Sequence, residues 1–298
     1  MILINEYKKV LTIVSKNIDT KLHTLISKVI INYLRSLNIQ LIEKKYLKKY
    51  KAIDYIFFDK NKVIKHNGIF RRLKGLPVDF CIQMLLSRKK KLFLTDMDGT
   101  IIKNETLNDI ARFLGKGEQV KKITDLGMKG RLDFSTSLNN RVEILKGLKI
   151  SSLEMAKKNI TFMDGASELF KSLNKNKIHT VLISGGFKPI TTYVKETLKI
   201  NEEFSNTFGI EGDLFSGTVS GTVVNASYKE VILNRFKKNL SLKSEQIVSM
   251  GDAANDLNML LSSGLAIAYK ATDVVKANVD NQINNTDISS LMYFLDLK

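Results

Sequence analysis

The chain has 298 residues, of which 44% are hydrophobic and 26% are charged, and its formal net charge is +17. This balance is typical of a globular protein of one or two domains, and it excludes disordered, collagen-like and coiled-coil chains. Cys81 is the single cysteine, so no intramolecular disulfide can form, and no apolar run approaches the roughly 18 residues of a membrane helix. We therefore expect a cytoplasmic protein without a membrane partner.

The excess of positive charge lies in the first third of the chain. Residues 1–90 hold 20 Lys and Arg against 6 Asp and Glu, whereas residues 91–298 hold 27 against 24. A basic region can bind nucleic acid, but here basic and aromatic residues do not alternate in a stacking pattern. A lysine-rich solvated surface explains the charge better, and nucleic-acid binding remains the less favoured alternative.

Residues 1–85 are predicted to form a small basic α+β domain. The β-branched run Val10–Val14 predicts a strand, and Asp19 or Thr20 can cap a helix whose apolar residues recur with helical period. Such a domain can serve in regulation or in homodimer formation, and both alternatives stay open. Three further strands are predicted at Ile39–Ile42, Tyr55–Phe58 and Val78–Ile82.

After a basic junction, Arg88-Lys89-Lys90-Lys91, the pattern changes to compact apolar strands followed by longer helical stretches. This alternation is typical of a parallel sheet with crossover helices, so residues 86–298 are predicted to form a doubly wound α/β domain. Helical periodicity over residues 102 to about 172 indicates an inserted helical cap. Turn residues within Gly209–Val224 predict a β-hairpin.

Two carboxylates follow the first strand of this α/β domain. Leu92–Thr95 runs into Asp96-Met97-Asp98-Gly99-Thr100, and open α/β sheets bind ligands at the carboxyl ends of their strands. Alternate side chains of such a loop point the same way, so Asp96 and Asp98 can address one substrate. One carboxylate can attack while the other moves a proton, and both suit magnesium. The alternative is a solvated Asp-Gly turn.

Three further stretches complete a candidate site. A buried strand ends in Ser184-Gly185-Gly186, where a hydroxyl and backbone N–H groups can hold phosphate oxygens. Lys229 can place an ammonium on the same phosphate, and Gly251–Asp256 brings another pair of carboxylates to a strand end. Taken alone, the serine stretch is often only a turn and the lysine only a surface residue. All four stretches together, in this order, are a far more specific signal for a catalytic site than any one of them.

The four pieces resemble the four motifs of the haloacid dehalogenase superfamily of phosphohydrolases. The match covers residues 88 to about 290, and the N-terminal region resembles the regulatory extension of bacterial members. The family usually has Ser where Gly99 stands and Gly where Ala253 stands, but neither departure removes a catalytic group. Similarity to the phosphoserine phosphatases rests on Asn104–Leu107, Met128–Phe134, Arg141–Gly147 and Ser184–Phe187.

The resemblance implies magnesium-dependent hydrolysis of O-phospho-L-serine to L-serine and phosphate, the last step of serine biosynthesis. Asp96 would form an aspartyl phosphate, while Asp98 would protonate the leaving oxygen and then activate water. A carboxylate can approach a phosphate dianion only when a metal and a lysine offset the repulsion. The implied catalytic residues are Asp96, Asp98, Ser184 and Lys229, and the implied magnesium ligands are Asp96, Asp252 and the backbone carbonyl of Asp98, arranged by Asp256.

Substrate selection is expected from the cap. Phe134, Leu138 and Leu145 fall on one helical stripe, with Arg141 at its edge. A guanidinium beside an apolar stripe suits a bidentate grip on a carboxylate, although a structural ion pair is the alternative. Glu105 can serve a helix dipole, but the resemblance assigns it to the substrate amine. The implied substrate contacts are Glu105, Met128, Phe134, Arg141, Ser184, Gly185, Lys229 and Asn255.

Two alternatives to the phosphoserine reading stay open. One is a phosphatase of the same mechanism that acts on another small phosphomonoester. The other, from a different class, is a nucleic-acid-binding protein that works through residues 1–90. An intact catalytic set argues against the second.

Overall fold

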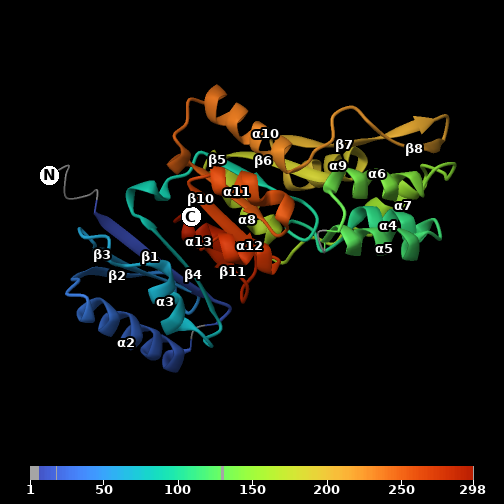
Figure 1. Cartoon of the computed structure of the whole chain (residues 1–298). Coiled ribbons are helices and arrows are strands. Elements are labelled where there is room, and N and C mark those ends of the chain that lie inside the picture. The colour runs from blue at the N-terminus through green and yellow to red at the C-terminus, as the bar shows by residue number, and fades with distance from the viewer. Residues whose placement is uncertain (1–6, 18, 129–130, 298) are drawn as a thin grey trace.

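The computed structural model describes residues 7–17, 19–128 and 131–297, without the side chain of Met128. In this part of the chain, eleven strands form one sheet. Helices cover the sheet, and a group of helices extends beyond one end of it (Figure 1). None of the described helices is both long and apolar enough to cross a bilayer.

The N-terminal elements follow the order β-α-β-β-α-β. Asp19 caps the first helix, where its carboxylate accepts the N–H of Leu22 at 2.7 Å. This helix buries Ile26 and Ile30 against the strands, whereas Leu25 is 45% exposed. The bounds are β1 (Lys8–Ser15), α2 (Thr20–Ser36), β2 (Leu41–Lys48), β3 (Ala52–Phe58), α3 (His66–Leu73) and β4 (Val78–Met84).

A parallel set of strands follows in the chain. Alternate residues of a strand face opposite sides of a sheet, and here both sides are covered by helices. Leu92 and Leu94 pack with α10 and α11, whereas Phe93 packs with α8 and α9. The strands are β5 (Leu92–Thr95), β6 (His179–Phe187), β7 (Glu202–Glu211), β8 (Leu214–Ser220), β9 (Ile247–Gly251), β10 (Leu265–Tyr269) and β11 (Gln282–Ile283), and the helices on this sheet are α8 (Ala166–Lys175), α9 (Lys188–Leu198), α10 (Ala226–Asn239), α11 (Leu257–Ser262), α12 (Asp273–Asn278) and α13 (Ser290–Phe294).

The strand order explains where a site can form. The sheet runs β2-β3-β1-β4-β11-β10-β9-β5-β6-β7-β8, and β5 is parallel to both of its neighbours, β9 and β6. The connection after β5 leads to β6 on one side, whereas the connection after β9 leads to β10 on the other, and such a divergence opens a crevice at the carboxyl ends of the two strands. The predicted doubly wound α/β core is therefore confirmed.

Four helices lie between β5 and α8 and gather at one end of the molecule, beside the β7–β8 hairpin (Figure 1). The hairpin begins earlier than predicted, at Glu202, and the N–H of Gly147 donates to the carbonyl of Phe215 at 2.8 Å. That these helices act as a separate cap stays a prediction. They are α4 (Thr106–Phe113), α5 (Gly117–Met128), α6 (Phe134–Glu143) and α7 (Ser152–Lys158).

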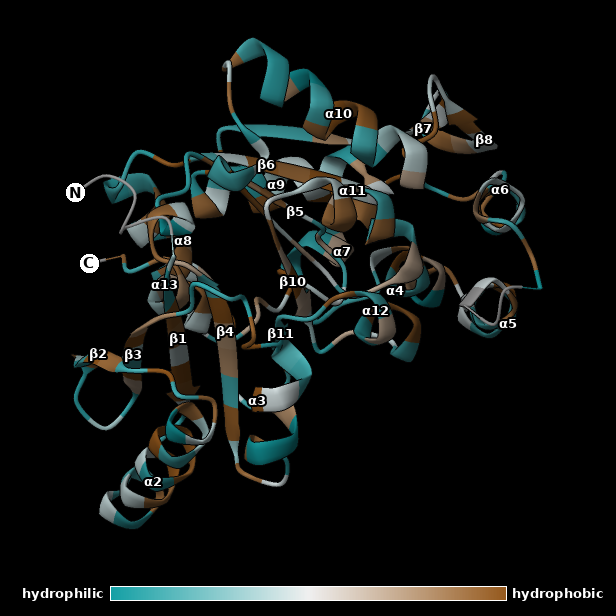
Figure 2. Ribbon diagram, turned by 60° about the vertical axis from the view of Figure 1, so that its left-hand side comes forward, coloured by the Kyte–Doolittle hydropathy of each residue, from teal (hydrophilic) through white to brown (hydrophobic). Residues whose placement is uncertain are grey.

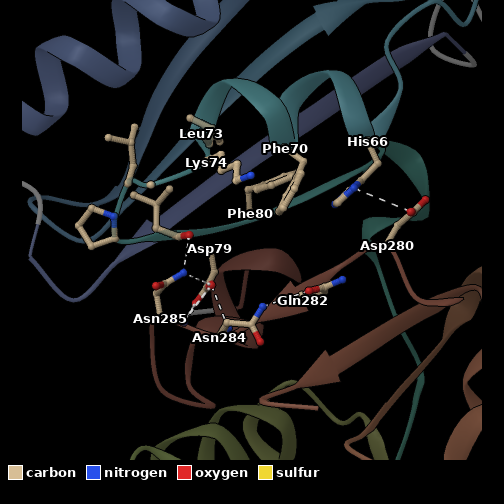
Figure 3. A pocket seen from close by; sticks show the side chains of 14 residues that line it. His66, Phe70, Leu73, Lys74, Asp79, Phe80, Asp280, Gln282, Asn284 and Asn285 are labelled. Atoms are coloured by element: carbon tan, nitrogen blue, oxygen red, sulfur yellow. Dashed lines mark hydrogen bonds and ion pairs between the residues drawn. The ribbon is translucent and has the colours of Figure 1, made fainter. Parts of the chain in front are cut away.

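The N-terminal strands join the parallel strands in one sheet, because β4 pairs with β11 at Phe80 and Gln282. Asp79 of β4 accepts hydrogen bonds from the backbone N–H groups of Asn284 and Asn285 (Figure 3). Figure 2 shows β1 and β4, which are largely apolar, beside α13. Cys81 belongs to the same hydrophobic cluster as the core strands. The domain boundary near residue 85 stays a prediction.

Arg88, in the predicted basic junction, is buried rather than solvated, with 4% of its surface exposed. Its guanidinium donates to both carboxylate oxygens of Asp54, at 2.6 and 3.1 Å, and to Thr12 Oγ1 at 3.1 Å. The remaining donors reach the carbonyls of Tyr293 (2.5 Å) and Phe294 (3.0 Å). The junction is thus held to both ends of the chain, which its basic sequence did not indicate.

Candidate active site

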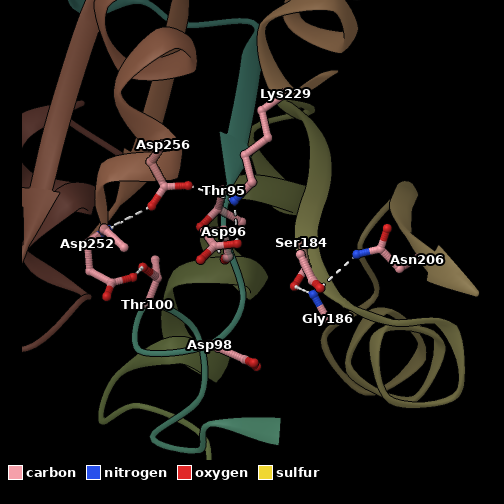
Figure 4. Close-up of polar contacts among 12 residues, drawn as sticks. Thr95, Asp96, Asp98, Thr100, Ser184, Gly186, Asn206, Lys229, Asp252 and Asp256 are labelled. Atoms are coloured by element: carbon pink, nitrogen blue, oxygen red, sulfur yellow. Dashed lines mark hydrogen bonds and ion pairs between the residues drawn. The ribbon is translucent and has the colours of Figure 1, made fainter. Parts of the chain in front are cut away.

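Lys229 joins two carboxylates at the carboxyl edge of the sheet (Figure 4). Its Nζ lies 2.6 Å from Asp96 Oδ1, after β5, and 2.6 Å from Asp256 Oδ1, after β9. Lys229 and Asp256 are completely buried. Burial alone would lower the pKa of Lys229, but Asp256 and Asp96 raise it above its usual value. A charged ammonium therefore stands beside the predicted nucleophile.

Asp96, Asp252 and Asp256 each place a carboxylate oxygen within 4.8 Å of the others. Asp256 has both oxygens engaged, since Oδ2 accepts the N–H groups of Asp252 and Ala253 at 3.1 Å. Asp252 Oδ1 accepts from Thr100 at 2.7 Å, and among the described residues no donor lies at hydrogen-bond distance from its Oδ2. Asp96 and Asp252 thus offer oxygens toward one point, a donor set that fits a divalent cation.

Burial and mutual repulsion raise the pKa values of two carboxyl groups in this cluster. Burial raises the pKa of Asp96 to about 7, with Lys229 opposing the shift and Asp256 adding to it. Burial likewise raises the pKa of Asp252 to about 8, and the charge of Asp256 adds to that shift. Crowded carboxylates of this kind ionise readily only beside a positive charge, which a divalent ion provides.

Asp98 is held by one oxygen and leaves the other free. Its Oδ2 accepts from the backbone N–H of Thr106 at 3.1 Å and from the Thr106 hydroxyl at 2.8 Å. Its Oδ1 is buried and has no hydrogen-bond partner within the described part of the chain. Burial, Glu105 and Asp96 raise the pKa of Asp98 well above its usual value. A carboxyl group in this setting is suited to proton transfer.

Ser184 ends the regular part of β6, at the edge of the crevice opposite Asp252 (Figure 4). It is 1% exposed, and its Oγ accepts the N–H of Gly186 at 2.9 Å. A Cβ added to Gly185 would lie 2.8 Å from Phe134 Cζ. Glycine at position 185 therefore lets Phe134 of α6 approach the predicted phosphate loop.

Arg141 faces the site from α6. Its Nε donates to the carbonyl of Ser137 at 3.1 Å, and among the described residues no carboxylate lies within ion-pairing distance of the guanidinium. Partial burial lowers the pKa of Arg141, while the charges of Glu105 and Asp98 raise it. The structural ion pair considered from the sequence is thus absent from the described chain, and the guanidinium keeps donors for another partner.

Comparisons with known proteins agree with this geometry. A family described as haloacid dehalogenase-like hydrolase matches residues 90–264. A phosphoserine phosphatase from Methanocaldococcus jannaschii is 37% identical over 210 residues, which are 70% of this chain and 100% of that protein. The chain belongs to the haloacid dehalogenase-like hydrolases, in the branch of the phosphoserine phosphatases.

Solved structures of the same hydrolases match over most of their length. A haloacid dehalogenase family hydrolase from Salmonella enterica serovar Typhi has a TM-score of 0.85 at 26% identity, covering 97% of this chain and 98% of that one. A phosphoserine phosphatase solved with bound substrate has a TM-score of 0.66 at 37% identity, covering 69% of this chain and 98% of that one. The first match includes the N-terminal strands, whereas the second covers about two thirds of the chain.

The two departures from the hydrolase motifs differ in their structural basis. Gly99 has φ +69°, and a Cβ added there would lie 2.7 Å from Asp252 Oδ2, so glycine relieves both strain and crowding. At the other departure, the backbone N–H of Ala253 donates to Asp256 at 3.1 Å, an interaction that is independent of the side chain. Neither position disturbs the catalytic carboxylates.

Three further residues, Glu105, Asn255 and Met128, were predicted to contact the substrate. Glu105 is exposed at the N-cap position of α4 and makes no capping hydrogen bond, so both its interaction with the helix dipole and its contact with a substrate amine stay predictions. Asn255 is half-buried beside Asp256 in a short 3₁₀ turn, Ala254–Asp256. The side chain of Met128 lies outside the described residues, as do Lys129 and Gly130 of the sequence motif.

Sequence reasoning missed two residues that shape the site. Thr106 follows Glu105 at a helix start, a position where a hydroxyl commonly bonds backbone, but nothing pointed to Asp98 as its partner. Asn206 is completely buried in β7 and bonds the loop after Ser184. A single asparagine in a polar strand gives no sequence signal for such a contact.

Proposed function

We propose that this hydrolase cleaves O-phospho-L-serine to L-serine and phosphate, with magnesium as the cofactor. The observation that carries the proposal is the placement of Arg141, whose guanidinium has free donors and stands near Asp98 and Glu105. In phosphoserine, the carboxylate would pair with the guanidinium of Arg141, the amine with the carboxylate of Glu105, and the phosphate with Lys229. The identity of 37% to a phosphoserine phosphatase supports the same substrate.

The first chemical step is assigned to Asp96 and Asp98. The free carboxylate oxygen of Asp96 attacks phosphorus, a bond forms between them, and the bond from phosphorus to the serine oxygen breaks. Asp98 donates a proton from Oδ1 to that leaving oxygen, because Thr106 occupies Oδ2. Serine leaves as the neutral alcohol, and the phosphoryl group stays on Asp96.

The second step returns the enzyme to its starting state. Water attacks the phosphoryl group while Asp98 Oδ1 takes its proton, and the bond from phosphorus to Asp96 breaks. Lys229 and the Ser184 and Gly185 groups hold the phosphate oxygens during both steps. Since Lys229 already lies 2.6 Å from Asp96, its charge stands where the entering phosphate needs it.

The metal would be held by Asp96, Asp252 and the backbone carbonyl of Asp98, and Asp256 would keep Lys229 and the Asp252 loop in place. When bound, magnesium supplies positive charge that offsets the repulsion between the Asp96 carboxylate and the phosphate oxygens. The remaining proposed substrate contacts are Glu105 to the amine, Met128 and Phe134 to the apolar part of the molecule, and Asn255 near the phosphate.

Several broader proposals accompany this activity. The chain would supply the last step of serine biosynthesis in the cytoplasm, where a single buried cysteine stays reduced. Residues 1–85 would form a regulatory or dimerising domain, and residues 86–298 the phosphatase domain, with its helical cap at 102–172. A homodimer would be tested by the molar mass in solution.

The experiment is phosphate release from a panel that contains phosphoserine, phosphothreonine, glycerol phosphate and p-nitrophenyl phosphate. We expect the highest kcat/KM for phosphoserine. A higher value for another substrate of the panel would favour the alternative, a phosphatase for a different small phosphomonoester. Absence of phosphate release from every substrate, with magnesium present, would contradict the mechanism.

A further inference from the structure

The strand β6 is interrupted where it carries the phosphate loop. Its pairing with β7 runs up to Ile183 opposite Phe204 and resumes at Phe187 opposite Asn206. Four steps along β6 thus correspond to two along β7, so the residues between form a bulge. A bulge takes backbone groups out of the ladder, and a buried carbonyl without a partner costs free energy.

Asn206 fills this gap with its side chain (Figure 4). Its Nδ2 donates to the carbonyl of Gly185 at 2.8 Å, and its Oδ1 accepts the N–H of Val224 at 2.8 Å. One neighbour can only accept and the other can only donate, so the amide has a single allowed orientation. A carboxylate lacks the donor, and an aliphatic chain lacks both groups.

The bond to Gly185 acts on Ser184 through one peptide unit. The Gly185 carbonyl and the Gly186 N–H belong to the same planar group, so fixing the carbonyl fixes the direction of the N–H. That N–H donates to Ser184 Oγ at 2.9 Å. With one lone pair of the oxygen used in this way, the Ser184 hydroxyl keeps its own proton to donate to a phosphate oxygen.

The bond to Val224 acts on Lys229 through the start of α10. Asn225 follows directly and caps this helix, because its side chain accepts the N–H of Tyr228 at 3.0 Å. The carbonyl of Asn225 accepts the N–H of Lys229 at 3.0 Å. The side-chain amide of Asn206 is therefore linked to Lys229, which contacts Asp96, by two hydrogen bonds and the Val224–Asn225 peptide bond.

We propose that Asn206 is a positioning residue that sets the Ser184 loop and the Lys229 helix at the separation a phosphoryl group requires. The inference rests on the proposed function, because Ser184 and Lys229 are taken to hold the phosphate. Asn206 itself does not touch the substrate. It ties two segments that are distant in sequence into one phosphate cradle.

The test compares Asn206→Asp with Asn201→Asp. Asn201 lies at the opposite end of the same strand pair, where its Oδ1 only accepts, from Thr180 N–H at 2.8 Å and Thr180 Oγ1 at 2.9 Å. Aspartate keeps that acceptor but removes the donor that Asn206 needs. We expect Asn206→Asp to lower kcat by about 10- to 100-fold and to raise the inhibition constant of inorganic phosphate by about tenfold. Asn201→Asp should keep both near wild type.

The inhibition constant of phosphate separates positioning from instability. Partial unfolding lowers the amount of active enzyme and hence the apparent kcat, but it leaves the inhibition constant of the folded fraction unchanged. Asn206→Ser is a second variant for the case that Asn206→Asp does not fold. An unchanged inhibition constant in either folded variant would overturn the inference.

The same series is also measured with p-nitrophenyl phosphate, because the cradle holds the phosphate of any monoester. A wild-type enzyme that ignores phosphoserine but cleaves the aryl ester would refute the proposed substrate alone. Asn206 variants that match Asn201→Asp on the aryl ester would refute the positioning role alone.

Discussion

Among the described residues, buried opposite charges meet at the carboxyl edge of the sheet and where the chain passes from β4 to β5. In the second, the guanidinium of Arg88 donates to a carboxylate, a hydroxyl and two carbonyls. At the carboxyl edge of the sheet, Asp98 Oδ1 is buried without a hydrogen-bond partner and Asp252 Oδ2 accepts no hydrogen bond, as far as the described residues go. The buried polar groups of the Arg88 cluster thus have their hydrogen bonds satisfied, as expected for a cluster that stabilises the fold. The cluster around Asp98 and Asp252 leaves oxygens that a ligand can use.

The two clusters also differ in where their hydrogen-bond partners come from. Arg88 bonds to groups from β1, β3 and the C-terminal helix, so its partners come from the whole length of the chain. The ammonium of Lys229 bonds to Asp96 and Asp256, which follow two neighbouring strands. We therefore expect the Arg88 cluster to serve stability and the Lys229 cluster to serve activity, and substitutions can test this difference.

The largest effect is expected for Asp96→Asn. The substitution removes the attacking charge with almost no change in volume, so activity should fall by several orders of magnitude while the protein stays folded. Phosphate release and acid-quench trapping of a phosphoenzyme measure the two consequences. Turnover near the wild-type level would contradict the role of Asp96 as nucleophile.

Removal of divalent ions should also abolish activity, since Asp96 and Asp252 place carboxylate oxygens close together and the ammonium of Lys229 contacts Asp96 but not Asp252 among the described residues. We expect loss of activity in EDTA, recovery with magnesium and inhibition by calcium, whose larger and looser coordination misaligns the attack. Full activity in a metal-stripped sample would show that the carboxylate cluster works differently.

Arg88→Met should affect stability rather than chemistry. It leaves Asp54 buried without its cation, which typically costs about 3–5 kcal/mol of the free energy of unfolding. Urea unfolding measures this loss, and kcat at low temperature should stay near wild type. The double variant with Asp54→Leu should recover part of the loss, because no unpaired charge remains. An unchanged urea midpoint in Arg88→Met would reject a stabilising role.

Arg141→Ala should act on one substrate only. It removes a charge-assisted contact worth about 1.5–3 kcal/mol, so kcat/KM for phosphoserine should fall by about 10- to 150-fold. Hydrolysis of p-nitrophenyl phosphate, which has no carboxylate of this kind, should stay within twofold. An equal loss on both substrates would mean that Arg141 supports the fold of α6.

The smallest effect is expected at Cys81. Burial raises the pKa of its thiol to about 12, and the side chain is fully enclosed in the hydrophobic cluster. Iodoacetamide at pH 8 should therefore leave the native protein unmodified and fully active, whereas the protein in urea should react. Rapid labelling of the native protein would indicate that the contact between β4 and the core opens readily.

The sequence could indicate that these side chains lie together, because they sit in short contiguous motifs at strand ends, whereas their catalytic roles stay predictions. Asp96, Asp98, Ser184, Lys229 and Asp252 all lie at or around the crevice, where the parallel sheet places them. Each motif combines a buried strand with a polar turn, and that combination is visible in a single stretch of sequence.

The residues that sequence analysis missed act through distant partners. Arg88 read as part of a solvated basic run, yet its partners Tyr293 and Phe294 lie more than 200 residues away. Asn206 bonds a bulge that follows from the pairing of two strands, and pairing is a property of the folded chain. The sequence also showed no sign that the N-terminal strands continue the parallel sheet, because the two sets of strands are joined by a single strand pairing, between Phe80 and Gln282.

The buried guanidinium also fixes an order of events during synthesis. Arg88 and Asp54 can pair soon after they are made, but the carbonyls of Tyr293 and Phe294 follow Arg88 by more than 200 residues. Until then, part of the guanidinium and the apolar side of β1 lack their final partners. Domains usually fold in the order in which they emerge. Here β1 completes its packing only after α13 has been made.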